Sequence, residues 1–380
     1  MIIEPKLRFK EFSGSWSRES LGALGTFKGG GTPESQNKKY WNGDIPWISS
    51  SDISEDNLHN INISRKISDE AISSSATKLI PKDSILFVSR VGVGKLAINS
   101  VELCTSQDFV NFITKKNILF IGYYFLANKK YLTRYSQGTS IKGITSDLIS
   151  SFKINLPGDN AEQQKIASFL SSVDKKIELL AKKHELLEKY KKGLMQKIFS
   201  QEIRFKQDDG SDFPDWESFD LGSISDVYQS KTISQQDLTY EGFDVYGANG
   251  IIGKYSKYNH EEAQIAIGCR GTCGKVNFTN PKSWITGNAM VVNVESSKNV
   301  IKLFLYQLLK RTNFTYLITG GAQPQITGAI KKHKIELPSK VEQQKIASFL
   351  SALDKKIDLT KQQKDKTQTF KKGLFQQIFV

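Results

Sequence analysis

The sequence predicts an α+β protein in which two globular domains alternate with two long helices. Three observations lead to this fold class. The stretch EQQKIASFLS begins at Glu162 and again at Glu342. Each copy opens a segment of 38 residues without proline, and the two segments share 22 identical positions. The remaining stretches are rich in glycine, serine and aromatic residues and contain short β-forming runs. A repeat with two copies 180 residues apart is not a solenoid, whose repeats are far shorter.

Four segments follow one another along the chain. Residues 1–160 are predicted to form the first globular domain, and 161–202 a central helix. The second globular domain spans 203–340, and 341–380 form a C-terminal helix. Within the globular segments, runs such as SILFVS, AQIAIG and MVVNV predict strands, with one helix expected in each domain near 118–136 and 298–312. The match of SILFVSRVGVGKL to QIAIGCRGTCGKV, again 180 residues apart, makes the two domains diverged copies.

Each predicted helix carries apolar side chains three and four residues apart, which is the heptad pattern of a coiled coil. In the first helix these are Ile166, Leu170, Val173, Ile177, Leu180, Leu187 and Leu194. In the second they are Ile346, Leu350, Leu353, Ile357 and Leu374. His184 and Lys191 occupy two core positions, where polar residues fix register at a cost in stability. We expect the two helices to pack antiparallel, which gives a pseudo-twofold arrangement. The simpler alternative is an amphipathic helix on an ordinary helical domain.

The charge balance favours a polyanionic partner. Lysine and arginine outnumber acidic residues 53 to 39, giving a net charge of +14 and a pI near 9.4. A nucleic acid or an acidic membrane surface would suit this charge. The opening MIIEPKLRFKEF lacks the apolar core of a signal peptide, and the apolar run 118–127 is too short to span a bilayer. Three cysteines without a paired framework suit a reducing cytoplasm, and the lone CxxxC spacing predicts no metal site.

Basic residues beside glycines are the first candidates for DNA contact. Arg90 and Lys95 recur as Arg270 and Lys275 at matching places, where glycines permit tight turns and close approach. Two polar loops, 137–145 and 320–327, occupy equivalent points before the last strand of each domain. They offer Thr139, Ser140, Lys142, Gln323 and Gln325. The alternative is a glycine hairpin with solvated charges and ordinary turn chemistry.

No catalytic constellation is present in the sequence. TNPKSW (279–284) has a lysine where an adenine methyltransferase needs its second proline, and PDWE (214–217) is not followed by the acid and lysine of a nuclease. We therefore expect a non-enzymatic chain. Helices that keep their sequence while globular domains diverge would hold two different readers at a fixed distance, as a two-part DNA target requires.

The chain resembles the specificity subunit of type I restriction-modification systems along essentially its whole length. The resemblance depends on the duplicated helices and on the junction KIFSQEIRFK (197–206). It also includes GGTP (30–33), YWNGDIPW (40–47), RVGVGK (90–95), VYGANGIIGKY (245–255), RGTCGK (270–275) and GGAQPQIT (320–327). It implies two target-recognition domains on double-stranded DNA, two adenine-methyltransferase subunits docked on this chain, and restriction subunits outside that core. The implied cofactors are S-adenosylmethionine, ATP and Mg, all bound by the partners and none by this chain.

Two other readings stay open from the sequence. One is the DNA-reading subunit of a related system in which a single partner both cuts and methylates. The other is a coiled-coil adaptor that binds only protein. Sequence-specific protection of DNA distinguishes the first reading from the adaptor, and ATP dependence of cleavage distinguishes it from the fused system.

Overall fold

The structure, a computed structural model, describes residues 5–134 and 143–379 of the chain. Its backbone packs into two compact units. Unit 1 comprises Met1–Lys182 and Lys361–Val380, and unit 2 comprises Lys183–Thr360. Each long helix contributes residues to both units. The segment bounds 1–160, 161–202, 203–340 and 341–380 stay a prediction.

The two long helices are α6, Asn160–Phe199, and α9, Lys340–Ile378. Neither contains proline, and most positions carry strong helix formers such as Ala, Leu, Lys, Glu and Gln. Their repeated opening residues are anchored in the same way. The Gln163 side chain donates to the Pro157 carbonyl at 2.9 Å, and the Gln343 side chain donates to Pro338 at the same distance.

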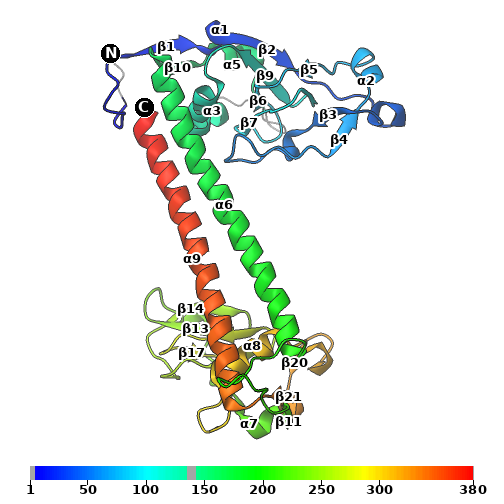
Figure 1. The fold of residues 1–380 in the computed structure, drawn as a ribbon, viewed down its shortest axis with the longest axis vertical. Helices are drawn as coiled ribbons and strands as arrows, with labels where there is room; N and C mark the ends of the chain where they lie inside the picture. The colour runs from blue at the N-terminus through cyan, green and yellow to red at the C-terminus, as the bar shows by residue number, and fades with distance from the viewer. Residues whose placement is uncertain (1–4, 135–142, 380) are drawn as a thin grey trace. The chain divides into compact units, whose positions relative to one another are not determined.

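Unit 1 contains a β-rich domain built on two four-stranded sheets and one short ribbon (Figure 1). The first sheet has the order β2-β9-β6-β7, with strands Gly25–Gly29, Phe109–Thr114, Ile85–Val88 and Leu96–Ile98. The second has the order β4-β3-β8-β5, with strands Arg65–Ile67, Ile45–Ile48, Leu103–Thr105 and Leu79–Ile80. In the ribbon, β1, Trp16–Ser20, pairs antiparallel with β10, Lys153–Pro157.

The helices of this domain are short except for α3, Ile118–Ala127. The others are α1 (Leu21–Leu24), α2 (Asp69–Ser73), α4 (Lys129–Arg134) and α5 (Ser146–Ser151). Asn117 caps α3 by accepting a hydrogen bond from the Phe120 amide. Because α3 is apolar on nearly every side, it is buried between the sheet and the helices α6 and α9 (Figure 1).

Unit 2 repeats this topology with a different sequence. The sheet β12-β18-β15-β16 has strands Asp226–Gln229, Ala289–Asn293, Ile265–Gly268 and Val276–Phe278. The sheet β14-β13-β17 has strands Gly250–Tyr255, Phe243–Gly247 and Trp284–Ile285. The ribbon of β11 (Glu217–Asp220) and β21 (Lys334–Leu337) corresponds to β1 and β10. Two further strands, β19 (Ile318–Thr319) and β20 (Gln325–Ile326), form a small hairpin.

The helical elements of unit 2 also have counterparts in unit 1. The short α7, Leu221–Ile224, follows β11 as α1 follows β1, and α8, Lys302–Arg311, takes the place of α3. In both units one strand pair is parallel, β3 with β8 and β13 with β17. Two diverged domains of one α+β fold were predicted, and the matching strand orders confirm this.

The predicted seam residues are part of each unit's core and do not face only the other helix. Within unit 1, Ile166, Leu170 and Val173 of α6 and Leu374 of α9 belong to the same buried cluster as Trp16, Phe120 and Tyr123. In unit 2, Ile346 and Leu350 belong to a cluster with Trp216 and Phe304. Burial is complete or nearly so for Ile166, Leu170, Val173, Ile346, Leu350, Ile357 and Leu374, and partial for Ile177, Leu180, Leu187, Leu194 and Leu353.

The two helices run antiparallel within each unit. In unit 1, Asp174 contacts Lys371, and in unit 2, Lys191 contacts Asp354. The two residue numbers add to 545 in both pairs, so one antiparallel register describes both contacts. Among residues 5–134 and 143–379, no helix combines the length and apolar character needed to cross a membrane.

Candidate nucleic-acid interface

The first candidate residues lie on the turn between β6 and β7 of unit 1. Arg90 and Val91 are exposed at this turn, and Gly92 and Gly94 have φ of 107° and 101°. Such positive values favour glycine, which explains the spacing of RVGVGK. Val91 has φ 37°, a conformation that costs a β-branched residue of order 1–3 kcal/mol. The turn is therefore strained at Val91, next to the exposed Arg90.

Backbone hydrogen bonds join the Arg90 turn to two other loops. The amides of Ser89 and Arg90 both donate to the Asp108 carbonyl, at 2.7 and 3.2 Å. The Ile144 amide donates to the Ser89 carbonyl at 2.8 Å. Together the three loops border an open cleft of about 1200 Å³. Its lining includes the polar residues Ser89, Arg90, Gln107, Asp108, Thr145 and Ser146.

Unit 2 has the same three-loop junction, which places Arg270 with Gln325. The amides of Cys269 and Arg270 donate to the Asn288 carbonyl at 2.9 and 3.3 Å. The Ile326 amide donates to the Cys269 carbonyl at 2.9 Å, and Arg270 forms an isolated antiparallel bridge with Gln325. Both Arg270 and Gln325 are exposed. The structure thus brings together two residues that the sequence offered separately.

The other candidates have different surroundings. The ammonium group of Lys275 donates to the carbonyl and side-chain oxygens of Asn249, at 3.0 and 2.7 Å. Lys95 is half-buried, and Gln323 is exposed on the loop between β19 and β20. Thr139, Ser140 and Lys142 lie outside the described residues. The role of all nine residues in DNA contact stays a prediction.

Sequence reasoning missed a polar pair, Gln107 and Asp108, that lines the cleft. Gln107 is exposed and Asp108 half-buried in unit 1, and the corresponding residues in unit 2 are Gly287 and Asn288. Gly287 has no room for a side chain, because a Cβ there would lie 2.5 Å from the Thr232 hydroxyl. Aligning the two domains at the offset of 180 would have paired Gln107 and Asp108 with Gly287 and Asn288 and so drawn attention to this loop.

Glycines of the GGTP stretch have a packing role. A Cβ on Gly30 would lie 2.1 Å from the Ser106 carbonyl oxygen, and one on Gly31 would lie 2.5 Å from the backbone of Thr77. The Gly31 carbonyl also accepts a 3.0 Å hydrogen bond from the indole of Trp47, which is buried. These residues hold the loop that ends in Gln107 and Asp108 against the domain.

Cys269 and His260 of unit 2 are buried, and Cys273 and His333 are partly buried. Burial raises the pKa of the Cys269 thiol, and burial lowers the pKa of His260 and His333. No group of three His, Cys, Asp or Glu side chains close enough to hold a metal ion occurs among the described residues.

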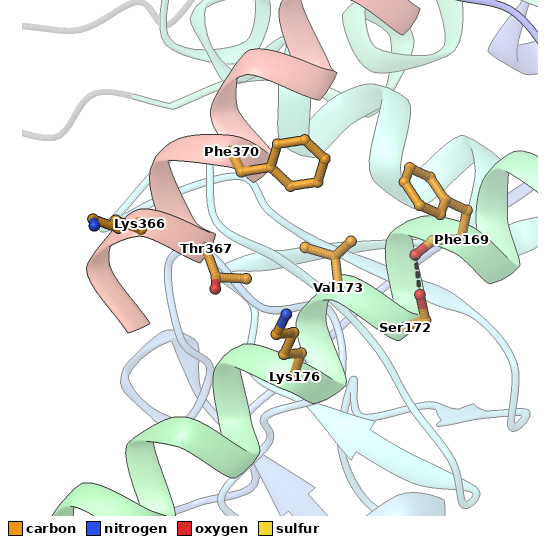
Figure 2. Close-up of a pocket in the computed structure, with 7 residues that line it drawn as sticks. All are labelled: Phe169, Ser172, Val173, Lys176, Lys366, Thr367 and Phe370. Carbon is orange, nitrogen blue, oxygen red and sulfur yellow. Dashed lines mark hydrogen bonds between the residues drawn. The ribbon is translucent and has the colours of Figure 1, made fainter. Parts of the chain in front are cut away.

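A second surface lies between the long helices of unit 1. Figure 2 shows the rings of Phe169 on α6 and Phe370 on α9 bordering a groove, with Val173 and Thr367 pointing toward each other at its floor. The groove has a volume of about 380 Å³ and is mostly apolar. Lys176 and Lys366 stand at its rim. Phe370 is 54% exposed, which is unusual for so large an apolar side chain.

Three residues that line this groove have similar counterparts in unit 2 at the same offset. Phe349 and Tyr190 replace Phe169 and Phe370, and Lys356 replaces Lys176. Tyr190 is 55% exposed, close to the value for Phe370. The chain therefore presents two related aromatic surfaces, one on the helices of each unit.

Comparisons with known proteins agree along nearly the whole chain. The family described as the type I restriction modification DNA specificity domain matches residues 14–189 and 214–368. The type I restriction enzyme MjaIX specificity subunit of Methanocaldococcus jannaschii is 27% identical over 380 residues, covering 90% of this chain and 87% of its own. The EcoprrI specificity subunit of Escherichia coli is 26% identical over 354 residues, covering 88% and 86%.

Solved structures show the same fold. The S subunit of a type I restriction-modification system from M. genitalium superposes with a TM-score of 0.68 at 17% identity, covering 100% of this chain and 99% of that one. A chain from a study of complex assembly in a type I system gives a TM-score of 0.56 at 15% identity, covering 95% and 96%. With two matched copies of the domain in one chain, this protein belongs to the family of type I restriction-modification DNA specificity subunits.

Proposed function

We propose that this chain reads a bipartite sequence in double-stranded DNA, one half with each unit, and that it has no catalytic activity of its own. One observation carries the proposal: the same three-loop junction, with an exposed arginine beside a polar loop, occurs in both units on different sequences. Arginine suits phosphates and guanine edges, while the neighbouring Asp, Asn and Gln side chains suit the amino groups of bases.

The chemistry of modification and cleavage would then belong to partner subunits. Two methyltransferase subunits would supply adenine methylation with S-adenosylmethionine, and restriction subunits would use ATP and Mg. A cytoplasmic location, where these partners meet DNA, is part of the same proposal. The contribution of this chain is to bind and position DNA, so that the methyltransferase acts only at chosen adenines.

The aromatic surfaces on the helices are proposed as the docking surface for the methyltransferase subunits. Two related aromatic surfaces fit two copies of one partner. The lysines beside them, Lys176 and Lys366 in unit 1 and Lys356 in unit 2, favour a partner segment that is apolar at its centre and acidic at its edges. Exchanging Phe370 for Ser should remove one methyltransferase copy, and exchanging Tyr190 for Ser the other. Mass photometry of the complex measures this, with the exposed Ile63 changed to Ser as the control. Full occupancy in both variants would contradict this docking site.

DNA binding is tested with Arg90→Ala and Arg270→Ala in the complex with the methyltransferase. Loss of a phosphate contact should reduce the slope of log K against log salt by about 1, and loss of a base contact should relax one motif position. The matched control is Arg18→Ala, an exposed arginine on β1 outside the cleft. If both variants keep the affinity, salt slope and methylated motif of the control, the junctions are not the reading sites.

A further inference from the structure

In unit 1, buried polar side chains link three helices, α9, α6 and α3. This cluster of Lys371, Asp174 and Tyr123 is called the joint of unit 1. Lys371 of α9 contacts Asp174 of α6 at 2.5 Å, and both side chains are more than nine-tenths buried. The phenol of Tyr123 on α3 donates to the other oxygen of Asp174 at 2.9 Å. Lys371 also donates to the Asp56 carbonyl at 3.1 Å and lies near the rings of Tyr123 and Phe375. Burial, followed by the charge of Asp174, raises the pKa of Tyr123, so the phenol keeps its proton and stays the donor.

Unit 2 contains the equivalent joint with a different third residue. The ammonium group of Lys191 on α6 lies 2.6 and 2.7 Å from the two oxygens of Asp354 on α9. Gln307 on α8 accepts from Lys191 at 3.2 Å and donates to Asp354 at 2.9 Å. Its side chain is buried, as Tyr123 is. Asp354 and Lys371 correspond to Asp174 and Lys191 by the repeat, so each helix supplies the acid to one joint and the base to the other.

The two joints together select a single register of the helices. If α9 slipped by one heptad in one direction, Asp174 would face Lys364, a pairing that unit 1 alone would accept. The same slip in unit 2 would set Lys191 against Ala347 and leave its charge buried without a partner. The opposite slip would set Asp174 against Ile378. Apolar heptads alone tolerate such slips, because leucine and isoleucine interchange at core positions.

The third residue of each joint extends this alignment to the globular domain. Tyr123 lies on α3 and Gln307 on α8. Each of these helices packs between its domain's sheet and the long helices. A hydrogen bond to a buried charge is directional and breaks when its donor moves by about 1 Å, whereas apolar contacts permit sliding. Each joint therefore fixes the orientation of one domain on the helix pair as well as the register of that pair.

We propose that Tyr123 and Gln307, with the Asp–Lys pairs they contact, are positioning residues that hold each DNA-reading domain in place on the helices. This inference rests on the proposed reading of bipartite DNA. It assigns these residues no contact with DNA. Their effect on sequence reading would pass through the orientation of the domains and through the register of α6 against α9.

The test uses full-length chains expressed with the methyltransferase partner, with long-read sequencing to map methylated adenines. Tyr123→Phe and Gln307→Met keep the bulk of the side chain and remove its hydrogen bonds. We expect the methylation rate at the target to fall roughly tenfold, the factor typical of one lost hydrogen bond to a charge. We also expect methylation at sites whose spacer differs by about one base pair, a shift of about 3.4 Å along DNA. Tyr240→Phe, at a fully exposed position, is the control.

Charge exchange provides the second measurement. Lys371→Asp alone places two carboxylates together and should abolish the complex, whereas Lys371→Asp combined with Asp174→Lys restores an ion pair and should restore complex and motif. The inference is overturned if Tyr123→Phe and Gln307→Met, folded by circular dichroism, methylate the wild-type motif at the control rate with an unchanged spacer. Failure of the double exchange to recover the complex also overturns it. Absence of any bipartite motif with the wild-type chain would instead refute the proposed function.

Discussion

Replacing Leu170 with Ala tests whether the start of α6 belongs to the core of unit 1. Leu170 is fully buried and lies in the same cluster as Trp16, Phe120 and Leu374, contributed by three separate parts of the chain. Truncation of a buried leucine removes its transfer free energy and leaves a cavity, which together cost about 2–5 kcal/mol. We expect the upper half of this range, because the site is enclosed by several elements that cannot all collapse inward.

The matched control is Leu179→Ala on the same helix. Leu179 is 55% exposed, so its truncation should change the free energy of unfolding by no more than about 0.5 kcal/mol. Both changes are from leucine to alanine in mid-helix, so differences in helix propensity cancel. The equivalent residue in unit 2, Leu350, is also fully buried and should respond as Leu170 does.

Urea unfolding followed by circular dichroism measures the effect. With a slope of about 2–3 kcal/mol per molar, a loss of about 3.5–5 kcal/mol lowers the midpoint by about 1.2–2.5 M. If the two units unfold separately, Leu170→Ala should shift only the transition of unit 1 and Leu350→Ala only that of unit 2. A shift for Leu170→Ala no larger than that for Leu179→Ala would show that the helix start is not a core element.

Three further predictions concern the domains, the helices and pH. Exchanging residues 203–340 for the matching domain of a relative should alter one half of the methylated motif, and a change in both halves would contradict separate reading. Matched heptad insertions within 181–188 and 361–368 lengthen each helix by about 10 Å and should lengthen the unread spacer by roughly three base pairs. An active double-insertion variant with an unaltered spacer would contradict this role of the helices. Burial lowers the pKa of His260 and His333, so their contribution to stability is complete above about pH 6.5 and is lost as pH falls through the folded pKa. Unfolding of unit 2 at pH 7 and 5 checks this, and equal midpoints would contradict it.

The repeated helices and the duplicated α+β domains were predictable because their signals are local. Periodicity identifies a helix from its own residues, and the offset of 180 marks equivalent turns without any knowledge of packing. The strand runs SILFVS and MVVNV became β6 and β18 for the same reason. Identity between the helix copies concentrates at their ends, and the structure explains this, since the start of each helix packs with the end of the other.

The core and the cleft of unit 1 were less predictable because they depend on pairings between distant segments. Nothing near Leu170 indicates that it packs with Trp16, which is more than 150 residues earlier. Asp108 was overlooked because a lone acid in a basic chain gives no local signal, and its place in the cleft arises from hydrogen bonds of its own carbonyl. Lys191 was noted as a polar core position, but its partner Asp354 was identifiable only from the register.

The identical openings of α6 and α9 make the same contacts in both places. The carboxylate of Glu162 forms an ion pair with the guanidinium of Arg8 at 2.7 Å. The carboxylate of Glu342 forms the equivalent ion pair with Arg204 at 2.8 Å. A genetic crossover within the shared EQQKIASFLS stretch would therefore leave the repeated residues themselves unchanged, including the glutamate that binds the arginine. One recombination event would give the progeny a different target sequence while the partner enzymes stay the same. The core around Leu170 contains Trp16 from the front half of the chain and Leu374 from the back half, so side chains from both parents would meet there.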